Sequence, residues 1–300
     1  MQDCKRELGE CRIYLMNILD GKLISENILD TISNEIFQLK NAEKKTPRLD
    51  IILVGNDYGS EKYVGMKEKV GEEVGIKVVV HRLEQMVNTL EVVNLIDGLD
   101  KDTEVDGYMV QLPLPDHINT NLVLDAIDPQ KDVDGLSPVN LGKLFQKDPS
   151  AVIPATPLGI VKLLEAYNIK LFGKHVVILG VSAIVGIPLE AVFLEKKATV
   201  TLCNIHTVGI EEISQTADIL VSATGQPLLV NKRFLKPDCV VVDVGTNRHP
   251  ETGKLVGDVD WDSVQGIPSY ITPVPGGVGP MTIASLMSNL MLCYKKNDRR

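Results

Sequence analysis

Short apolar runs alternate with helical patterns along the whole chain of 300 residues, and this alternation limits the fold more than any other feature. In the first half, strands that alternate with helices predict βαβ units built around a parallel sheet. The expected strands are 49–54, 77–82 and 107–112, and the expected helices are 25–40, 61–74 and 90–99.

The second half repeats this pattern after a new start. Thr156 is expected to cap a helix with Pro157 in its first turn, ending near Tyr167. Four strands should follow, and their apolar composition predicts that both faces are covered. They are expected at 175–179, 199–203, 218–223 and 239–244.

The predicted fold class is α/β, and the length suits two domains. The predicted parts are an N-terminal substrate domain with a parallel sheet, a Rossmann-type dinucleotide-binding domain and an N-terminal extension. A last helix, from Met281 to about Tyr294, is expected to pack back on the first domain. The boundaries are 15–150 with 281–300 for the first domain, 151–280 for the second and 1–14 for the extension.

Composition excludes several classes of protein. Lys and Arg number 31 against 40 Asp and Glu, a net charge of −9, which is unlike a nucleic-acid-binding surface. The longest apolar runs are too short to span a bilayer, and the first twelve residues lack the apolar core of a signal peptide. The five cysteines form no CxxC pair, so we expect neither disulfides nor a metal site. A cytoplasmic enzyme that binds small molecules is the prediction.

Lys67 stands where an apolar residue is expected. Segment 59–75 predicts a helix that Ser60 can cap. At 100° per residue, one narrow stripe of this helix holds Tyr63, Lys67, Val70 and Val74. Either the Lys67 amine reaches solvent at the edge of the core, or it is partly desolvated, with a pKa lowered toward neutrality that suits proton transfer. Tyr63 either packs in the core or offers a ring for stacking.

Gln111 and an aspartate pair are also candidates. Gln111 ends an apolar strand, where ligands bind in open α/β sheets, although it is equally consistent with an ordinary strand end. Asp132 and Asp134 are two residues apart in a predicted loop. No further ligand completes a metal site, so they are interpreted as acceptors for the N–H groups of a heterocycle or as turn residues.

Residues 175–186 have the strand, glycine turn and helix layout that holds a pyrophosphate against a helix N-terminus. The turn has Gly180, Ser182 and Gly186 instead of the full GxGxxG pattern, so an ordinary βα turn is the alternative. No carboxylate follows the next strand to hold the ribose of NAD, because Asn204 stands there.

Together these segments resemble the bifunctional methylenetetrahydrofolate dehydrogenase/methenyltetrahydrofolate cyclohydrolase family. The resemblance runs from about Leu19 to Leu292. It is carried by Ser60-Glu-Lys-Tyr-Val-Gly-Met-Lys-Glu-Lys69, Val110-Gln-Leu-Pro-Leu-Pro115, Pro129-Gln-Lys-Asp-Val-Asp-Gly135, Gly180-Val-Ser182 with Ile184-Val-Gly186, and Thr272-Pro-Val-Pro-Gly-Gly-Val-Gly-Pro-Met-Thr282.

The resemblance implies a homodimer that oxidises methylenetetrahydrofolate with NADP or NAD and hydrolyses the methenyl product. Lys67 would transfer protons, Tyr63 would stack on the folate, Gln111 would tune Lys67, and Asp134 would bind the pterin. The implied substrate-binding set is Tyr63, Lys67, Val110, Gln111, Leu112, Asp132, Asp134, Pro275, Gly276 and Gly277. The implied cofactor-binding set is Gly180, Val181, Ser182, Gly186, Ile205 and Thr246.

Two departures affect the cofactor prediction. The family commonly has Arg where Val181 stands, and Ser or Arg where Ile205 stands. Those side chains grip the 2′-phosphate of NADP, so a weakened NADP preference and NAD use are expected. A chain with only one working activity, a non-catalytic folate-binding homologue and a Rossmann dehydrogenase for another substrate are the alternatives.

Overall fold

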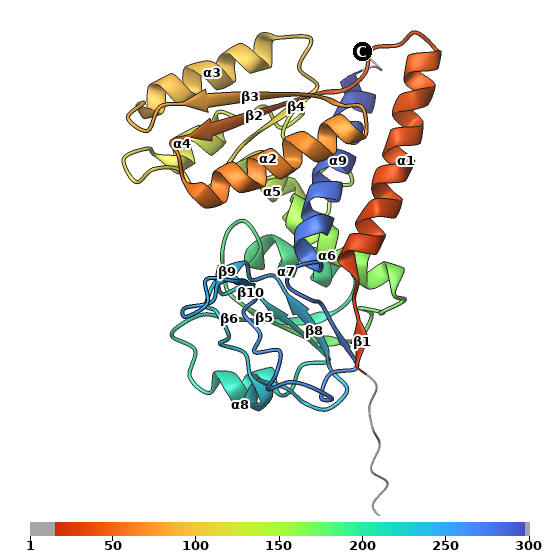
Figure 1. Ribbon diagram of the computed structural model, residues 1–300, viewed down its shortest axis with the longest axis vertical. Helices are drawn as coiled ribbons and strands as arrows, with labels where there is room; N and C mark the ends of the chain where they lie inside the picture. The colour runs from red at the N-terminus through yellow and green to blue at the C-terminus, as the bar shows by residue number, and fades with distance from the viewer. Residues whose placement is uncertain (1–15, 298–300) are drawn as a thin grey trace, which may run out of the picture.

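Two parallel sheets organise the protein, one in each half of the chain (Figure 1). The computed structural model describes residues 16–297. The first sheet has the strand order β3-β2-β4, with every pairing parallel. Its strands are β2 (Arg48–Val54), β3 (Lys77–Leu83) and β4 (Gly107–Val110). The strand β4 ends two residues earlier than predicted, which leaves Gln111 just beyond it.

The second sheet has the order β1-β11-β8-β7-β5-β6 and is also parallel. Its strands are β1 (Asn17–Ile18), β5 (His175–Leu179), β6 (Thr199–Cys203), β7 (Ile219–Ser222), β8 (Val240–Asp243) and β11 (Tyr270–Ile271). A two-stranded antiparallel hairpin, β9 (Asn247–Arg248) with β10 (Leu255–Val256), follows β8.

Two strands of this sheet differ from the prediction. The strand β1 is the first strand of the described residues but pairs with β11 in the second sheet, so residues 17–18 do not belong with the first-half sheet. Two residues are too few for a periodic signal. The strand β6 lies at the edge of the sheet and is only partly covered, with Thr199 exposed and Cys203 alone fully buried.

Helices cover both faces of the first sheet. The helices are α1 (Gly21–Asn41), α2 (Tyr58–Glu73), α3 (Thr89–Lys101), α4 (Thr120–Asp125), α5 (Pro138–Phe145), α6 (Ala155–Ala166), α7 (Gly186–Glu195), α8 (Ile210–Ser214), α9 (Val278–Asn297) and a 3₁₀ turn, η1 (Lys232–Phe234). Alternate residues of β2 point to opposite sides of the sheet. Leu49, Ile51 and Leu53 pack with α1, α2 and α9, whereas Ile52 and Val54 pack with α3 and α4. None of these described helices is long and apolar enough to cross a membrane.

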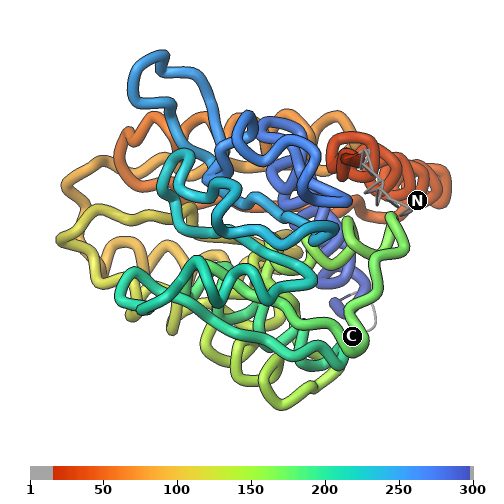
Figure 2. Tube along the Cα trace, turned by 90° about the horizontal axis from the view of Figure 1, so that it is seen from below, coloured from red at the N-terminus to blue at the C-terminus, as the bar shows by residue number. Residues whose placement is uncertain are grey.

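The last helix returns to the first half of the chain, as predicted. It packs against α1 and α6 and contributes Leu286, Met287 and Leu290 to the core beneath the first sheet. In Figure 2, α1 (red) lies at one edge of the molecule and α9 (blue) runs inside it. These helices hold the two sheets in a fixed relation.

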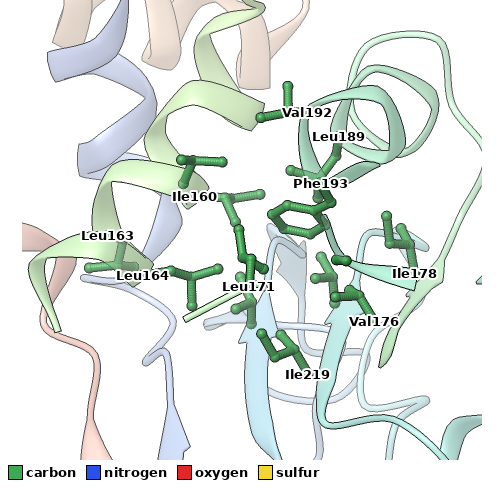
Figure 3. Close-up of a cluster of buried hydrophobic side chains, with 14 of the residues drawn as sticks. Ile160, Leu163, Leu164, Leu171, Val176, Ile178, Leu189, Val192, Phe193 and Ile219 are labelled. Atoms are coloured by element: carbon green, nitrogen blue, oxygen red, sulfur yellow. The ribbon is translucent and has the colours of Figure 1, made fainter. Parts of the chain in front are cut away.

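The core of the second half lies between α6, α7 and the second sheet. Figure 3 shows Ile160 and Leu164 of α6 directed toward Phe193 of α7 and Val176 of β5. Phe193 is fully buried, and an aromatic side chain of this size contributes about 3–5 kcal/mol to a core. This packing fixes the N-terminal ends of α6 and α7 beside the carboxyl ends of the strands.

Two helix starts differ from the prediction. Asp57, not Ser60, caps α2: its carboxylate accepts a hydrogen bond from the backbone N–H of Ser60 at 2.7 Å. The helix α6 begins at Ala155, without a side-chain cap, so Thr156 lies inside its first turn. In both cases the helix begins before the serine or threonine, so neither hydroxyl caps its helix.

Candidate active site

The helix α2 buries Lys67, whose side chain is only 6% exposed. The buried face of this helix is centred on Ser60, Val64, Lys67 and Gly71. Tyr63 and Val70, on the predicted stripe, are half-buried and flank that face. The Lys67 amine therefore does not reach solvent at the edge of the core, which rejects the first of the two interpretations.

Gln111 holds the Lys67 amine. The Lys67 Nζ donates a hydrogen bond to the Gln111 Oε1 at 2.9 Å and also contacts the Sδ of Met109 at 3.3 Å. The Gln111 Nε2 donates to the backbone oxygen of Leu112 at 2.7 Å. This second bond fixes the amide so that its oxygen faces the amine. A glutamine beyond the end of β4 thus has a defined orientation toward Lys67.

Burial shifts the pKa values of Lys67 and Asp134 in opposite directions. Desolvation lowers the pKa of the Lys67 amine, and the nearby Asp134 charge partly opposes this effect. Desolvation likewise raises the pKa of the Asp134 carboxyl, with the Lys67 charge acting against it. A lysine with a lowered pKa can give and take protons near neutral pH.

Backbone donors of its own loop surround the Asp132 carboxylate. Its carboxylate is 1% exposed and accepts hydrogen bonds from the backbone N–H groups of Gly135 at 2.8 Å and Ser137 at 2.8 Å. It also accepts one from the Asn140 side chain at 3.0 Å. These donors use its oxygens to hold the loop that carries Asp134, which favours the interpretation of Asp132 as a turn residue that supports the site. Val110 is likewise a core residue whose side chain packs with the α3 face.

A cavity of about 370 Å³ lies between the two halves and brings together the four predicted catalytic residues, Tyr63, Lys67, Gln111 and Asp134. Its first wall comes from α2, the end of β4 and the Asp134 loop. Its second wall comes from the start of α7 and the end of β8. The lining includes Asp57, Ser60, Tyr63, Lys67, Gln111, Leu112, Asp134, Thr156, Ile184, Val185, Val244, Thr246 and Thr282.

A second cavity, of about 620 Å³, continues from the first and contains the predicted glycine-proline loop. The two cavities share Tyr63, Val244, Thr246, Val278 and Gly279. Pro275, Gly276 and Gly277 line only the second cavity, together with residues of α1 and α2. The glycine-proline segment therefore borders both cavities, because Val278 and Gly279 also line the Lys67 cavity.

Two contacts cross between the halves at the start of α2. The Tyr63 hydroxyl donates a hydrogen bond to the Thr246 Oγ1 at 3.1 Å. One helical turn earlier, the Arg248 guanidinium lies over the Tyr58 ring, 5.1 Å from its centroid. The segment between β8 and β9 is thus held directly against the helix that carries Lys67.

The turn after β5 fits a pyrophosphate group. Gly180 has φ +111°, and a side chain at Gly186 would place its Cβ 2.0 Å from the Gly180 carbonyl oxygen, so both positions require glycine. The helix α7 has no side-chain cap, but in its first turn the Ile187 N–H donates to the Ser182 carbonyl oxygen at 3.1 Å and Pro188 has no N–H, so Gly186 carries the N–H that can face an anion. Ser182 accepts a hydrogen bond from the backbone N–H of Val185 within this turn at 3.2 Å.

The outer part of this predicted cofactor site is apolar. The Val181 side chain is 40% exposed and Ile205 is 91% exposed, so neither is part of the core. Asn204 accepts a hydrogen bond from the backbone N–H of His206 at 2.9 Å, which folds the loop after β6 upon itself. The two positions where the family commonly has polar or cationic groups thus present hydrocarbon to solvent.

The sequence reasoning missed a pair of threonines in the Lys67 cavity. The hydroxyls of Thr156 and Thr282 lie 3.0 Å apart, at the starts of α6 and α9. The sequence predicts Thr156 as a helix cap and gives Thr282 only as the last residue of the 272–282 motif. Two threonines near helix starts separated by more than a hundred residues give no signal that they meet.

Comparisons with known proteins agree with this arrangement. Residues 19–134 match the model of the tetrahydrofolate dehydrogenase/cyclohydrolase catalytic domain, and residues 154–298 match that of the family's NAD(P)-binding domain. The bifunctional protein FolD of Aliarcobacter butzleri is 44% identical over 95% of this chain and 99% of its own.

Solved structures give the same result. The bifunctional FolD dehydrogenase/cyclohydrolase of Campylobacter jejuni has a TM-score of 0.91 at 44% identity, covering 94% of this chain and 99% of its own. The Trypanosoma brucei FolD, solved with NADP and an inhibitor, has a TM-score of 0.91 at 33% identity, covering 95% and 99%. The chain therefore belongs to the tetrahydrofolate dehydrogenase/cyclohydrolase family.

Proposed function

We propose that this protein oxidises 5,10-methylenetetrahydrofolate to the methenyl form with a nicotinamide cofactor and then hydrolyses that product to 10-formyltetrahydrofolate, in one-carbon metabolism. The observation that carries the proposal is the Lys67 amine, 6% exposed and 2.9 Å from the Gln111 Oε1, in a cavity shared by both halves. A desolvated amine held by an oriented amide is suited to proton transfer, and a binding protein does not need one.

The chain's own residues have distinct roles in this proposal. Lys67 takes a proton from the water that attacks the bridging methenyl carbon, while Gln111 keeps the amine in place. Asp134 accepts hydrogen bonds from the N–H groups of the pterin ring, and Tyr63 stacks on the substrate beside the Thr246 contact. Leu112 lines the same cavity, and Pro275, Gly276 and Gly277 border its extension.

The nicotinamide cofactor fits the second half of the chain. The residues that would hold it are Gly180, Val181, Ser182, Gly186, Ile205 and Thr246. When bound, the cofactor supplies the hydride acceptor. Exposed hydrocarbon at Val181 and Ile205 gives a 2′-phosphate no charged partner, so we infer a weakened preference for NADP and use of NAD.

We also infer a homodimer in the cytoplasm. The strand β6 is the outer strand of its sheet and has only β5 as a partner among the described residues. An open strand edge favours pairing with a second copy of the chain. The proposed domain boundaries remain 15–150 with 281–300 and 151–280, and within the first of these β1 pairs with the second sheet.

One experiment tests the proposal. Oxidation of methylenetetrahydrofolate is followed with NAD and with NADP, and hydrolysis of methenyltetrahydrofolate is followed without cofactor. Both activities are expected, with NAD at least as effective as NADP. Hydrolysis without oxidation would favour the single-activity alternative, to which the apolar cofactor site points. Absence of both activities would reject the proposal.

A further inference from the structure

Asp258 is a fully buried carboxylate with an unusual number of donors around it. Its Oδ2 accepts hydrogen bonds from the Ser222 hydroxyl at 2.9 Å, from the backbone N–H of Thr224 at 2.7 Å and from the Thr224 hydroxyl at 2.8 Å. Its Oδ1 accepts one from the Asn247 side chain at 2.8 Å. Three of these donors lie at or just after the end of β7, and the fourth, Asn247, begins β9.

The donors belong to the two segments that shape the cofactor side of the cavity. Thr224 follows Ala223, and a side chain at Gly180 would come within 2.3 Å of the Ala223 carbonyl oxygen. The turn after β7 therefore supports the pyrophosphate turn directly. Asn247 follows Thr246, which makes the contact with Tyr63 across the cavity. One carboxylate thus links both segments.

A second carboxylate fixes the position of Asp258. The Asp243 Oδ1 accepts hydrogen bonds from the backbone N–H groups of Asp258 at 3.0 Å and Gly245 at 2.9 Å, and its Oδ2 accepts one from Val259 at 2.9 Å. A side chain at Gly245 would place its Cβ 2.2 Å from the Asp258 Oδ1, and one at Gly257 would be 1.8 Å from the Asp243 Oδ2. The packing leaves no room for either segment to shift independently.

We propose that Asp258 is a positioning residue for the dehydrogenase reaction, because it sets the place of the pyrophosphate turn relative to Thr246. The inference rests on the proposed function. Lys67, Gln111 and Asp134 belong to the opposite wall and receive no hydrogen bond from Asp258. Loosening the Asp258 contacts should therefore weaken cofactor binding and leave hydrolysis without cofactor intact.

The test is the substitution Asp258→Asn, assayed in the full chain. The amide replaces one acceptor oxygen with a donor, so either Thr224 or Asn247 loses its partner. We expect the KM for the nicotinamide cofactor to rise about tenfold, the change that loss of one hydrogen bond to a charged group produces. Dehydrogenase kcat should stay within about threefold of the wild type. Hydrolysis of methenyltetrahydrofolate without cofactor should stay within about twofold.

A matched control is Asp218→Asn. Asp218 lies before β7, at the opposite end of the sheet, where it accepts a hydrogen bond from the backbone N–H of His175 at 2.9 Å and pairs with Lys236 at 2.7 Å. The same chemical change there should lower the melting temperature without altering the cofactor KM. An equal rise of the cofactor KM in this control would show that general destabilisation, not positioning, is responsible.

Two results with Asp258→Asn overturn the inference: an unchanged cofactor KM, or a parallel fall of both activities that follows the loss of stability. If this variant does not fold, Thr224→Val removes a single donor, and a cofactor KM within error of the wild type overturns the inference equally. A wild-type protein without either activity would instead reject the proposed function. The two failures are therefore distinguishable.

Discussion

Replacing Lys67 with Met separates a catalytic amine from a structural one. Methionine has a similar length and no charge, so it fills the same space between α2 and β4. The Gln111 Oε1 loses its donor, at a cost of about 1–3 kcal/mol. Removing the amine also relieves the cost of desolvating it, which is the largest cause of the lowered pKa of Lys67. These effects oppose each other, and the free energy of unfolding should stay within about 2 kcal/mol of the wild type.

Activity should respond quite differently. Loss of a general acid–base group lowers rates by about 10²–10⁴-fold, which corresponds to about 3–5 kcal/mol of transition-state free energy. Both oxidation and hydrolysis should fall, while folate binding, measured by fluorescence quenching, persists. Lys101→Met is the control, since Lys101 is exposed on α3 and pairs with Asp97. Rates within threefold of the wild type in Lys67→Met would refute the catalytic role, and so would a loss of activity fully explained by unfolding.

Further substitutions test the electrostatics and the supporting contacts. The pKa of Lys67 lies below its ordinary 10.5, so the neutral amine forms at lower pH than in a free lysine. The rate of hydrolysis should therefore rise with pH and level off below pH 10.5. The variant Lys67→Arg stays protonated and should be inactive throughout the pH range. Asp132→Asn should lower the free energy of unfolding in urea by about 2–4 kcal/mol, because backbone donors lose a charged acceptor; an unchanged midpoint would exclude that role. Introducing Arg at both Val181 and Ile205 should raise kcat/KM for NADP relative to NAD by about tenfold or more, and an unaltered ratio would show that these positions do not face the 2′-phosphate.

Local periodicity made much of this site predictable. The stripe on α2 placed Lys67 among apolar neighbours, and the apolar run before Gln111 placed that residue at a strand end; both placements depend on short segments. Asp132 was beyond such reasoning, because an acid in a loop gives the same signal whether it faces a ligand or its own backbone. The meeting of Thr156 with Thr282 depends on packing between distant segments, which no local pattern encodes.

The helix α9 explains why the two halves of this chain are not independent units. Its first turns contribute Val278 and Met281 to the core of the second half, and its later turns contribute Leu286 and Leu290 to the core beneath the first sheet. The wall that carries Lys67 and the wall that carries Thr246 therefore both pack on the same helix, α9. They also contact each other through the hydrogen bond between Tyr63 and Thr246. At the other end of the chain, β1 pairs with β11 before α1 crosses to the first sheet. Proton transfer at Lys67 and cofactor binding at the turn after β5 require a constant distance between these two parts of the site. The chain crosses between the halves twice, at α1 and at α9, and these two crossings keep that distance constant.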